Sequence, residues 1–146
     1  MSTFSNEQHS LMKEKLAQAI KDFSYRLKRY DVNYSVALGY VPDNIDLSPL
    51  SKHIRETDRF IILDHHTCAV ILDCTNEECG IKAANNLLTH FQGSFFSTPL
   101  YTCVVTASNF DSIALMNQEL FYLLDYAIEH NMTSILLERS QVVEKH

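Results

Sequence analysis

The chain has 146 residues, of which 46% are hydrophobic and 21% charged, and its formal net charge is −6. This length and balance predict one globular domain of ordinary size that can bury a core without covalent staples. The negative charge argues against general nucleic-acid binding, which depends on clustered Lys and Arg. A small anionic ligand held by a local group of arginines is still compatible with it.

Cysteine usage and hydropathy indicate where such a protein works. Cys68, Cys74, Cys79 and Cys103 form no CxxC pair, and we interpret them as reduced core residues rather than as disulfides or zinc ligands. The N-terminus has no basic segment followed by an apolar one, and no run approaches the roughly 18 apolar residues of a membrane span. We therefore expect a cytoplasmic protein without membrane insertion and without a cofactor.

The first third of the chain predicts a helix, a strand and a second, short helix. Ser5 and Gln8 have the spacing of a capping box, and the apolar residues after them recur at helical spacing up to about residue 27. Residues 33–41 form a β-branched and aromatic run that Pro42 ends, which predicts a strand. Ser48 would then cap a short helix, with Pro49 at its first position, running towards Thr57.

A β-hairpin is predicted next. Two apolar runs, residues 60–63 and 69–72, flank a polar step at residues 64–67. Apolar runs of this kind are typical of strands that lie deep in a sheet, so we expect the hairpin at its centre. The short helix before it would end with Arg55 and Asp58 beside the hairpin.

The remaining elements complete an α+β fold. A helix is predicted from Thr75 or Asn76 to about Gly93, a strand around residues 101–105, a helix that Asp111 caps and Asn131 ends, and a closing strand at residues 134–137. This order predicts a ferredoxin-like βαββαβ core whose sheet is covered by helices on one side. The single domain 1–146 would comprise an N-terminal helix (1–31), the core (32–138) and a polar tail (139–146).

The segment around the hairpin also carries a resemblance. It reads Arg55-Glu56-Thr57-Asp58 and, after one strand, Asp64-His65-His66-Thr67-Cys68. It resembles GGDEF domains, the diguanylate cyclases, in which an RxxD motif precedes the GGDEF turn at this distance. Residues 83–88 and 119–127 resemble the helix after the hairpin and the final helix of that family. The resemblance covers nearly the whole chain in element order and implies a nucleotidyl cyclase-like fold in a bacterial signalling protein, although the GGDEF signature itself is absent.

The altered signature excludes the enzymatic function that the resemblance would otherwise imply. In the family, two glycines let nucleotide phosphates approach the backbone, and the acidic residue after them ligates magnesium together with a carboxylate at the end of the first strand. Here Asp64 and His65 occupy the glycine positions, His66 the metal position, and Thr67 and Cys68 the last two. Side chains fill the phosphate space, and imidazole is a poor ligand for magnesium. We therefore predict a degenerate, non-catalytic domain with no metal site.

The RxxD motif is the part of the resemblance that is retained. In the family, the arginine donates two hydrogen bonds to O6 and N7 of a guanine in cyclic di-GMP, and the aspartate accepts from the other edge. A guanidinium fork and a carboxylate suit those edges. Arg59 lies next to the motif, and Lys52 would share the face of the predicted helix with Arg55. The hypothesis is a regulatory cyclic di-GMP receptor using Arg55, Asp58 and Arg59; the alternative is that Arg55 and Asp58 merely end a helix.

Two further interpretations stay open. Residues 60–67 also resemble the strand and DHH motif of manganese-dependent phosphoesterases, but the chain lacks their DxD and is too short for their second domain. Adjacent histidines on a hairpin rarely ligate one metal, so we interpret His65 and His66 as turn residues that tolerate positive φ.

The other interpretation is an adaptor that binds a signalling protein or a second copy of itself. Such an adaptor would use a tyrosine patch formed by Tyr25, Tyr30, Tyr34 and Tyr40. Aromatic residues at this spacing are more often part of a core. The five remaining histidines are scattered, and we assign them no role.

Overall fold

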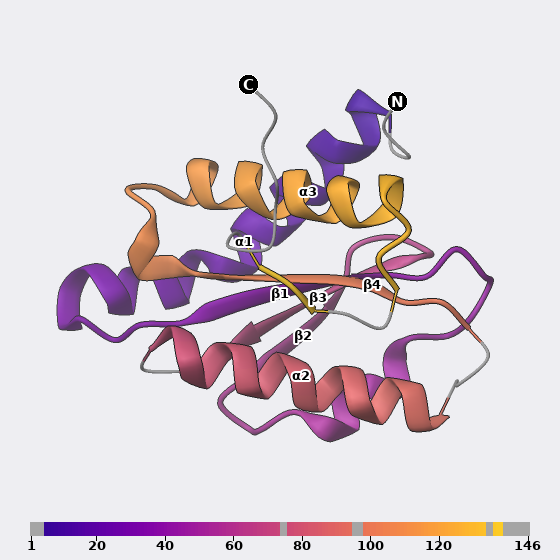
Figure 1. The fold of residues 1–146 in the computed structure, drawn as a ribbon. Helices are drawn as coiled ribbons and strands as arrows, with labels where there is room; N and C mark the ends of the chain where they lie inside the picture. The colour runs from indigo at the N-terminus through magenta and orange to yellow at the C-terminus, as the bar shows by residue number, and fades with distance from the viewer. Residues whose placement is uncertain (1–4, 74–75, 95–97, 134–135, 139–146) are drawn as a thin grey trace.

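A five-stranded mixed sheet organises the chain (Figure 1). The computed structural model describes residues 5–73, 76–94, 98–133 and 136–138. In chain order the elements are α1 (Asn6–Tyr30), β1 (Ser35–Tyr40), the 3₁₀ helix η1 (Ser48–His53), β2 (Arg59–Ile62), β3 (Thr67–Leu72), α2 (Glu77–Ser94), β4 (Tyr101–Thr106), the 3₁₀ helix η2 (Ala107–Asn109), α3 (Ile113–Glu129) and β5 (Leu136–Leu137). The predicted α+β fold with a ferredoxin-like core and an added N-terminal helix is confirmed.

The strand order is β2-β3-β1-β4-β5, so β1 is the central strand. It pairs antiparallel with β3 on one side and β4 on the other, and Gly39 lies opposite both Cys68 and Thr102. The predicted antiparallel β2–β3 hairpin is present. However, β2 is an edge strand with partly exposed residues, so the expectation that both hairpin strands lie deep in a central position is wrong.

Helices cover both faces of the sheet, which corrects the prediction of helices on one side. Figure 1 shows α1 and α3 above the sheet and α2 below it. Successive residues of a strand point to opposite faces, and every residue of β3 and β4 is buried. Burial of such continuous strands requires cover on both sides. Two apolar cores result, one under α1 and α3 and the other under α2 and η1.

Local signals fix most helix ends. The Ser5–Gln8 capping box begins α1 as predicted, and Asp31 ends it in a left-handed conformation with φ of 57°. Asn131, with φ of 51°, follows the end of α3 as predicted. The side chain that caps the start of α3 is Ser112, which accepts from the Leu115 N–H; the prediction of Asp111 as the cap was therefore one residue early.

The cysteines that the structure describes are thiols, and two of them belong to the core as predicted. Cys68 and Cys103 are buried in β3 and β4. Burial raises the pKa of Cys68 to about 12 and also raises the pKa of Cys103. Cys79 is half-buried in α2, while Cys74 lies outside the described residues.

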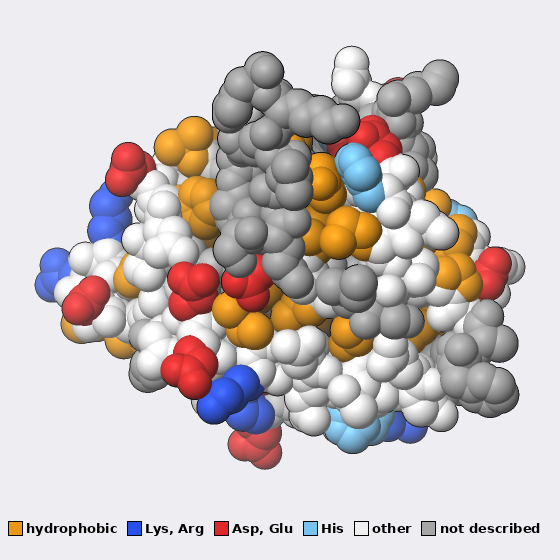
Figure 2. Space-filling view, viewed as in Figure 1, with side chains coloured by type: hydrophobic (Ala, Val, Ile, Leu, Met, Phe, Trp, Pro, Cys, Tyr) orange, Lys and Arg blue, Asp and Glu red, His pale blue; other side chains and the backbone are white. Residues whose placement is uncertain are grey.

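Two features of the surface bear on function. Within the described ranges, no helix combines the length and the apolarity that crossing a bilayer requires. The face in Figure 2 carries acidic side chains gathered left of centre and basic ones at separate places. The predicted tail and residues 134–135 of the predicted closing strand lie outside the described residues.

Candidate functional site

Arg55 and Asp58 lie in a turn that leads into β2, not on a helix. The 3₁₀ helix η1 ends at His53, and Ile54 is extended. Asp58 Oδ2 accepts the backbone N–H of Arg55 at 3.0 Å, and the Asp58 N–H donates to the Arg55 carbonyl at 3.0 Å. Side-chain acceptors of this kind compete with helical hydrogen bonds, which explains why the predicted helix towards Thr57 does not form.

The Asp58 carboxylate is fully engaged inside the protein. Its Oδ2 accepts the backbone N–H and Nε of Arg55, the latter at 3.1 Å, and its Oδ1 accepts Arg55 Nη2 at 3.0 Å. The Asp73 N–H donates to Oδ1 as well, at 2.9 Å. A carboxylate offers about four lone-pair positions, so these donors occupy all of them. The two partners also differ in exposure: the Asp58 side chain is 3% exposed and that of Arg55 is 52% exposed.

These hydrogen bonds govern the ionisation of Asp58. Burial alone would raise the pKa of this carboxyl, but hydrogen bonds from the Arg55 side chain and from the Asp73 and Arg55 N–H groups lower it below its ordinary value of 3.8. Asp58 is therefore a carboxylate at neutral pH, and its bidentate pair with Arg55 holds the base of the hairpin together.

Asp73 and Arg26 belong to the same cluster, and the sequence analysis missed both. The Asp73 carbonyl accepts Arg55 Nη2 at 2.9 Å, and its carboxylate lies 3.8 Å from Arg26 of α1. The hairpin register could have identified Asp73, because Arg59 pairs with Ile71 and residues just before β2 must therefore face those just after β3. No local pattern marks Arg26, which reaches the cluster only through the packing of α1.

The other basic residues expected at the site do not donate any of the hydrogen bonds that the Asp58 carboxylate accepts. Arg59 Nη1 donates to the Ala19 carbonyl of α1 at 3.4 Å. Lys52 is exposed in η1, and because no helix continues to Arg55, the expectation that they share a helical face is wrong. The structure thus brings together Arg55, Asp58, Asp73 and Arg26, with Arg59 on the side of β2 that faces α1.

At the hairpin tip, the polar residues hold the turn itself. Asp64 Oδ1 accepts the His66 N–H at 2.9 Å, and the Leu63 N–H donates to the Thr67 carbonyl at 2.8 Å. The described residues with positive φ are Asp31 and Asn131 only, so the expectation of positive φ at the tip is wrong for the residues between Leu63 and Thr67. His65 is exposed.

His66 is bound to the end of the first strand. Its Nδ1 lies 3.0 Å from the Val41 carbonyl oxygen, and its own carbonyl accepts the Val41 N–H at 2.9 Å. A carbonyl can only accept, so Nδ1 carries the proton. Val41 is 0% exposed, and the next position on β3, Thr67, is also buried. The strand end therefore meets His66 through backbone groups of Val41, whose side chain is buried in the core and offers no carboxylate to a metal.

Neither alternative site assembles in the form expected from the sequence. Among the described residues, no group of three or more His, Cys, Asp or Glu side chains could hold a metal ion. Of the four tyrosines, Tyr34 is buried in the core and Tyr40 packs against His66, whereas Tyr25 and Tyr30 are exposed with ring centroids 6.3 Å apart. A patch of all four is therefore excluded, and a pair at the end of α1 is what is exposed.

Comparison with solved structures identifies the fold. A microbial GGDEF domain described in an interaction with cyclic di-GMP superimposes with a TM-score of 0.66 and 10% identity, covering 86% of this chain and 92% of that one. The GGDEF domain of TpbB, also called YfiN, from Pseudomonas aeruginosa gives a TM-score of 0.61 and 13% identity, covering 88% and 87%.

These matches bear out the resemblance that the sequence suggested at the level of the fold: this chain has the fold of GGDEF domains. Identities this low establish the fold and no more. No protein-family model matches the chain, and no curated protein matches it.

Proposed function

We propose that this protein is a non-catalytic regulatory module built on the GGDEF fold. The observation that carries the proposal is the pairing of His66 with Val41 at the hairpin tip. By the resemblance, a cyclase has magnesium carboxylates at the position of His66 and at the end of its first strand, whereas here His66 is an imidazole bonded to the backbone of Val41, and Val41 has an apolar, buried side chain. Asp64 and His65 stand where glycines admit phosphate, which further disfavours GTP binding at the tip.

The test of inactivity is direct. Purified protein is incubated with GTP and magnesium, and separately with GTP and manganese, and the nucleotides are separated by chromatography. We expect GTP to remain intact, because His66 and Val41 supply no carboxylate to magnesium between the tip and the first strand. Formation of cyclic di-GMP in the presence of either magnesium or manganese would overturn the proposal.

The ligand that we propose for this module is cyclic di-GMP, bound at Arg55 and Asp58. The supporting observation is the geometry of the internal pair, in which Nε and Nη2 of Arg55 form a fork onto the two oxygens of Asp58. The same Arg55 fork fits O6 and N7 of guanine. Once Arg55 turns to the base, the released Asp58 oxygens can accept from the guanine N1–H and N2–H. Binding would thus exchange two internal hydrogen bonds for contacts from both groups to one base.

Charge near the turn favours this exchange. Arg26 and Arg59 both lie between α1 and the hairpin, and the Arg55 guanidinium is half-exposed. Arg55 and Arg26 lie beside the carboxylates of Asp58 and Asp73, and Arg59 adds a third guanidinium on the side of β2 that faces α1, in a chain whose net charge is −6. A ligand with two phosphates gains from such a field.

Isothermal titration with cyclic di-GMP tests the site. We expect saturable binding that Arg55→Ala weakens at least about tenfold, since a bidentate arginine–guanine contact contributes roughly 1–3 kcal/mol. Arg29→Ala, which removes another exposed arginine at the end of α1, should bind like the unmodified protein. Cyclic di-AMP is the control ligand, because adenine presents an amino donor where guanine presents O6.

Thermal melting of each variant separates lost binding from lost folding. No heat with high micromolar cyclic di-GMP, or equal affinity of the Arg55 and Arg29 variants, would contradict the receptor function. Inactivity towards GTP would be unaffected by that result, and the protein would then be proposed as an adaptor.

The adaptor alternative is favoured by the exposed contact between Tyr25 and Tyr30. Tyrosine pairs of this kind are common anchors of protein interfaces. Light scattering over a range of protein concentrations tests self-association. A dimer that becomes a monomer in the double variant Tyr25→Ser, Tyr30→Ser would support the adaptor. A monomer at all concentrations would reject the homodimer.

A further inference from the structure

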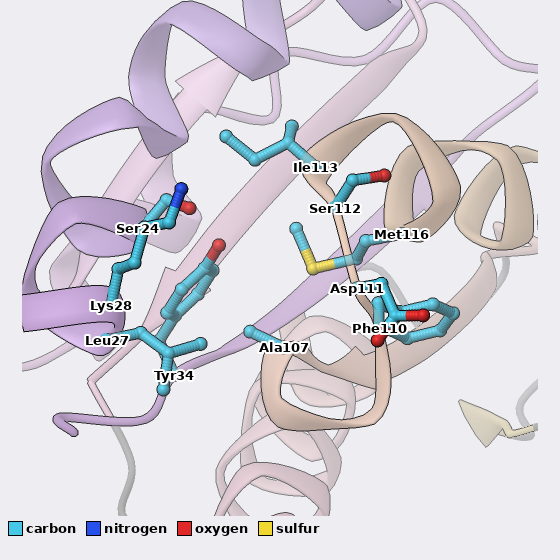
Figure 3. A pocket seen from close by; sticks show the side chains of 10 residues that line it. All are labelled: Ser24, Leu27, Lys28, Tyr34, Ala107, Phe110, Asp111, Ser112, Ile113 and Met116. Atoms are coloured by element: carbon cyan, nitrogen blue, oxygen red, sulfur yellow. The ribbon is translucent and has the colours of Figure 1, made fainter.

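A cavity that is open to solvent lies between α1 and α3, apart from the Arg55–Asp58 turn. It has a volume of about 420 Å³ and is bordered by the C-terminal half of α1, the segment before β1 and the start of α3 (Figure 3). It shares no lining residue with the Arg55–Asp58 turn or the hairpin tip. The volume lies at the lower end of the range for small-molecule sites, so an occupant would be small.

One wall of this cavity carries converging hydrogen-bond donors. Ser24 and Lys28 lie four residues apart on α1, and Figure 3 shows their ends on the same side as the Tyr34 hydroxyl. The Tyr34 side chain is 2% exposed and its hydroxyl is hydrogen-bonded to the side chain of Ser24. Within the described ranges, Lys28 has no ion-pair partner.

Tyr34 keeps its proton under ordinary conditions. Burial raises the pKa of its phenol above 10.0, although the hydrogen bond with Ser24 partly opposes this. The phenol can accept the serine proton and still donate its own. Lys28 and Tyr34 thus offer an ammonium and one hydroxyl donor to one small volume, which suits a single anionic group.

The rest of the lining is mostly apolar. Leu27 lies beside Lys28 on the α1 side, and Ala107 of η2 with Ile113 and Met116 of α3 lines the other side, where Met116 faces Tyr34 in Figure 3. Asp111 and Ser112 also line the cavity. With one lysine, no arginine and a nearby carboxylate, the lining disfavours phosphates and other multiply charged anions.

We propose that this cavity binds a small monocarboxylic acid with an apolar body. The carboxylate would accept from Lys28 and from Tyr34, whose phenol is oriented by the hydrogen bond with Ser24, and the body would pack between Leu27 and Met116. Because α1 and α3 supply opposite walls, such a ligand would also bridge these two helices.

Phenylacetate is the probe, and amide chemical shifts of the full chain in ¹H–¹⁵N spectra are the readout. We expect saturable shifts centred on residues 24–34 and 107–116, with millimolar affinity for so small a ligand. Phenylacetamide, which has the same shape without the charge, should bind about tenfold more weakly, and inorganic phosphate should not shift these signals. No saturation by about 20 mM phenylacetate, or equal binding of the amide, would overturn the proposal.

Variants locate the contact. Lys28→Gln should weaken phenylacetate binding about tenfold and Tyr34→Phe about threefold, as expected for a charged and a neutral donor. Lys21→Gln is the matched control, since Lys21 is exposed on the same helix and is not part of the cavity lining. Equal affinity in the Lys28 and Lys21 variants would contradict the assignment.

Discussion

Thr67 has a hydroxyl that finds no hydrogen-bond partner among the described residues, although the residue is completely buried. A buried, unsatisfied polar group costs about 1–3 kcal/mol. Thr67→Val removes the hydroxyl and keeps the shape, so we expect the free energy of unfolding to rise by about 1 kcal/mol. Urea denaturation followed by circular dichroism measures this.

The control for Thr67 is a threonine whose hydroxyl is paired. Thr106 Oγ1 and Ser35 Oγ are 3.0 Å apart in the core, and Thr106→Val leaves Ser35 without this partner. That variant should lose about 1–2 kcal/mol. The prediction for Thr67 is wrong if both variants shift in the same direction.

Asp58 makes the free energy of unfolding depend on pH. Its pKa is lowered in the folded protein, against burial, by hydrogen bonds from Arg55 and from the Asp73 N–H. A carboxylate with a depressed folded pKa stabilises the protein fully above its unfolded value, near 3.8, and this stabilisation is lost as the pH falls through the folded value. Asp58→Asn should therefore be less stable than the unmodified protein at pH 7, and the difference should shrink below about pH 4.

Urea midpoints of both proteins between pH 7 and pH 3 measure this change. Comparison with the variant removes the contribution of other acids, such as Asp46, whose pKa is also lowered, by hydrogen bonds from Ser48. A difference that stays constant over this range would mean that Asp58 does not titrate as argued.

At the scale of elements, the sequence predicts the helices and strands that have a long periodic pattern of apolar residues and local signals at their ends. The helix α1 follows from the Ser5–Gln8 capping box, and the β2–β3 hairpin from two apolar runs around a polar step. The short helix before β2 is mispredicted beyond His53 because the Asp58 side chain captures the Arg55 N–H. The sequence predicts Arg55 and Asp58 as a candidate site, but it does not indicate that they pair with each other or that Asp73, which the hairpin register brings near, bonds to both.

The helix α2 approaches β1 so closely that its first glycine is required. A Cβ added at Gly80 would lie 2.6 Å from the Ser35 Cβ and still closer to its Oγ, whereas one added at Gly93 meets nothing within 4 Å. Gly80→Ala should therefore destabilise the fold by about 1–3 kcal/mol despite the better helix propensity of alanine. Gly93→Ala, near the end of the same helix, should be neutral or stabilising by up to about 1 kcal/mol.

Thermal denaturation of the two glycine variants gives the comparison. Equal melting temperatures would show that α2 can shift away from β1 at no cost, and the close contact would then have no role in fixing the helix position.

At the scale of the whole molecule, sequence patterns do not predict that helices cover both faces of the sheet. The runs in β3 and β4 are largely apolar and buried along their whole length, and a strand buried on both faces does not indicate which helix covers which face. Chain order alone places α1 next to β1, but packing puts it beside α3, where Met12, Leu16, Ile20 and Phe23 enter the core. The N-terminal helix is thus part of the core and not an appendage to it.

This packing predicts that α1 unfolds together with the sheet. Leu16 is completely buried, whereas Leu11 on the same helix is 61% exposed. Leu16→Ala should lower the free energy of unfolding by about 2–5 kcal/mol, and Leu11→Ala should change it by less than about 0.5 kcal/mol. The chain has seven tyrosines and no tryptophan, and two of the tyrosines, Tyr25 and Tyr30, lie on α1. With Tyr25→Phe and Tyr30→Phe in every protein compared, tyrosine fluorescence reports on the fold outside α1, and far-ultraviolet circular dichroism reports on the helices.

In urea, the two signals should give coincident transitions for the tyrosine-substituted parent protein and for both leucine variants, as cooperative unfolding requires. An independent α1 would instead lose helical signal in the Leu16 variant before the fluorescence changes. That outcome would separate the helix from the core, and it would also remove the rigid connection by which Arg26 of α1 reaches Asp73 beside the Arg55–Asp58 turn.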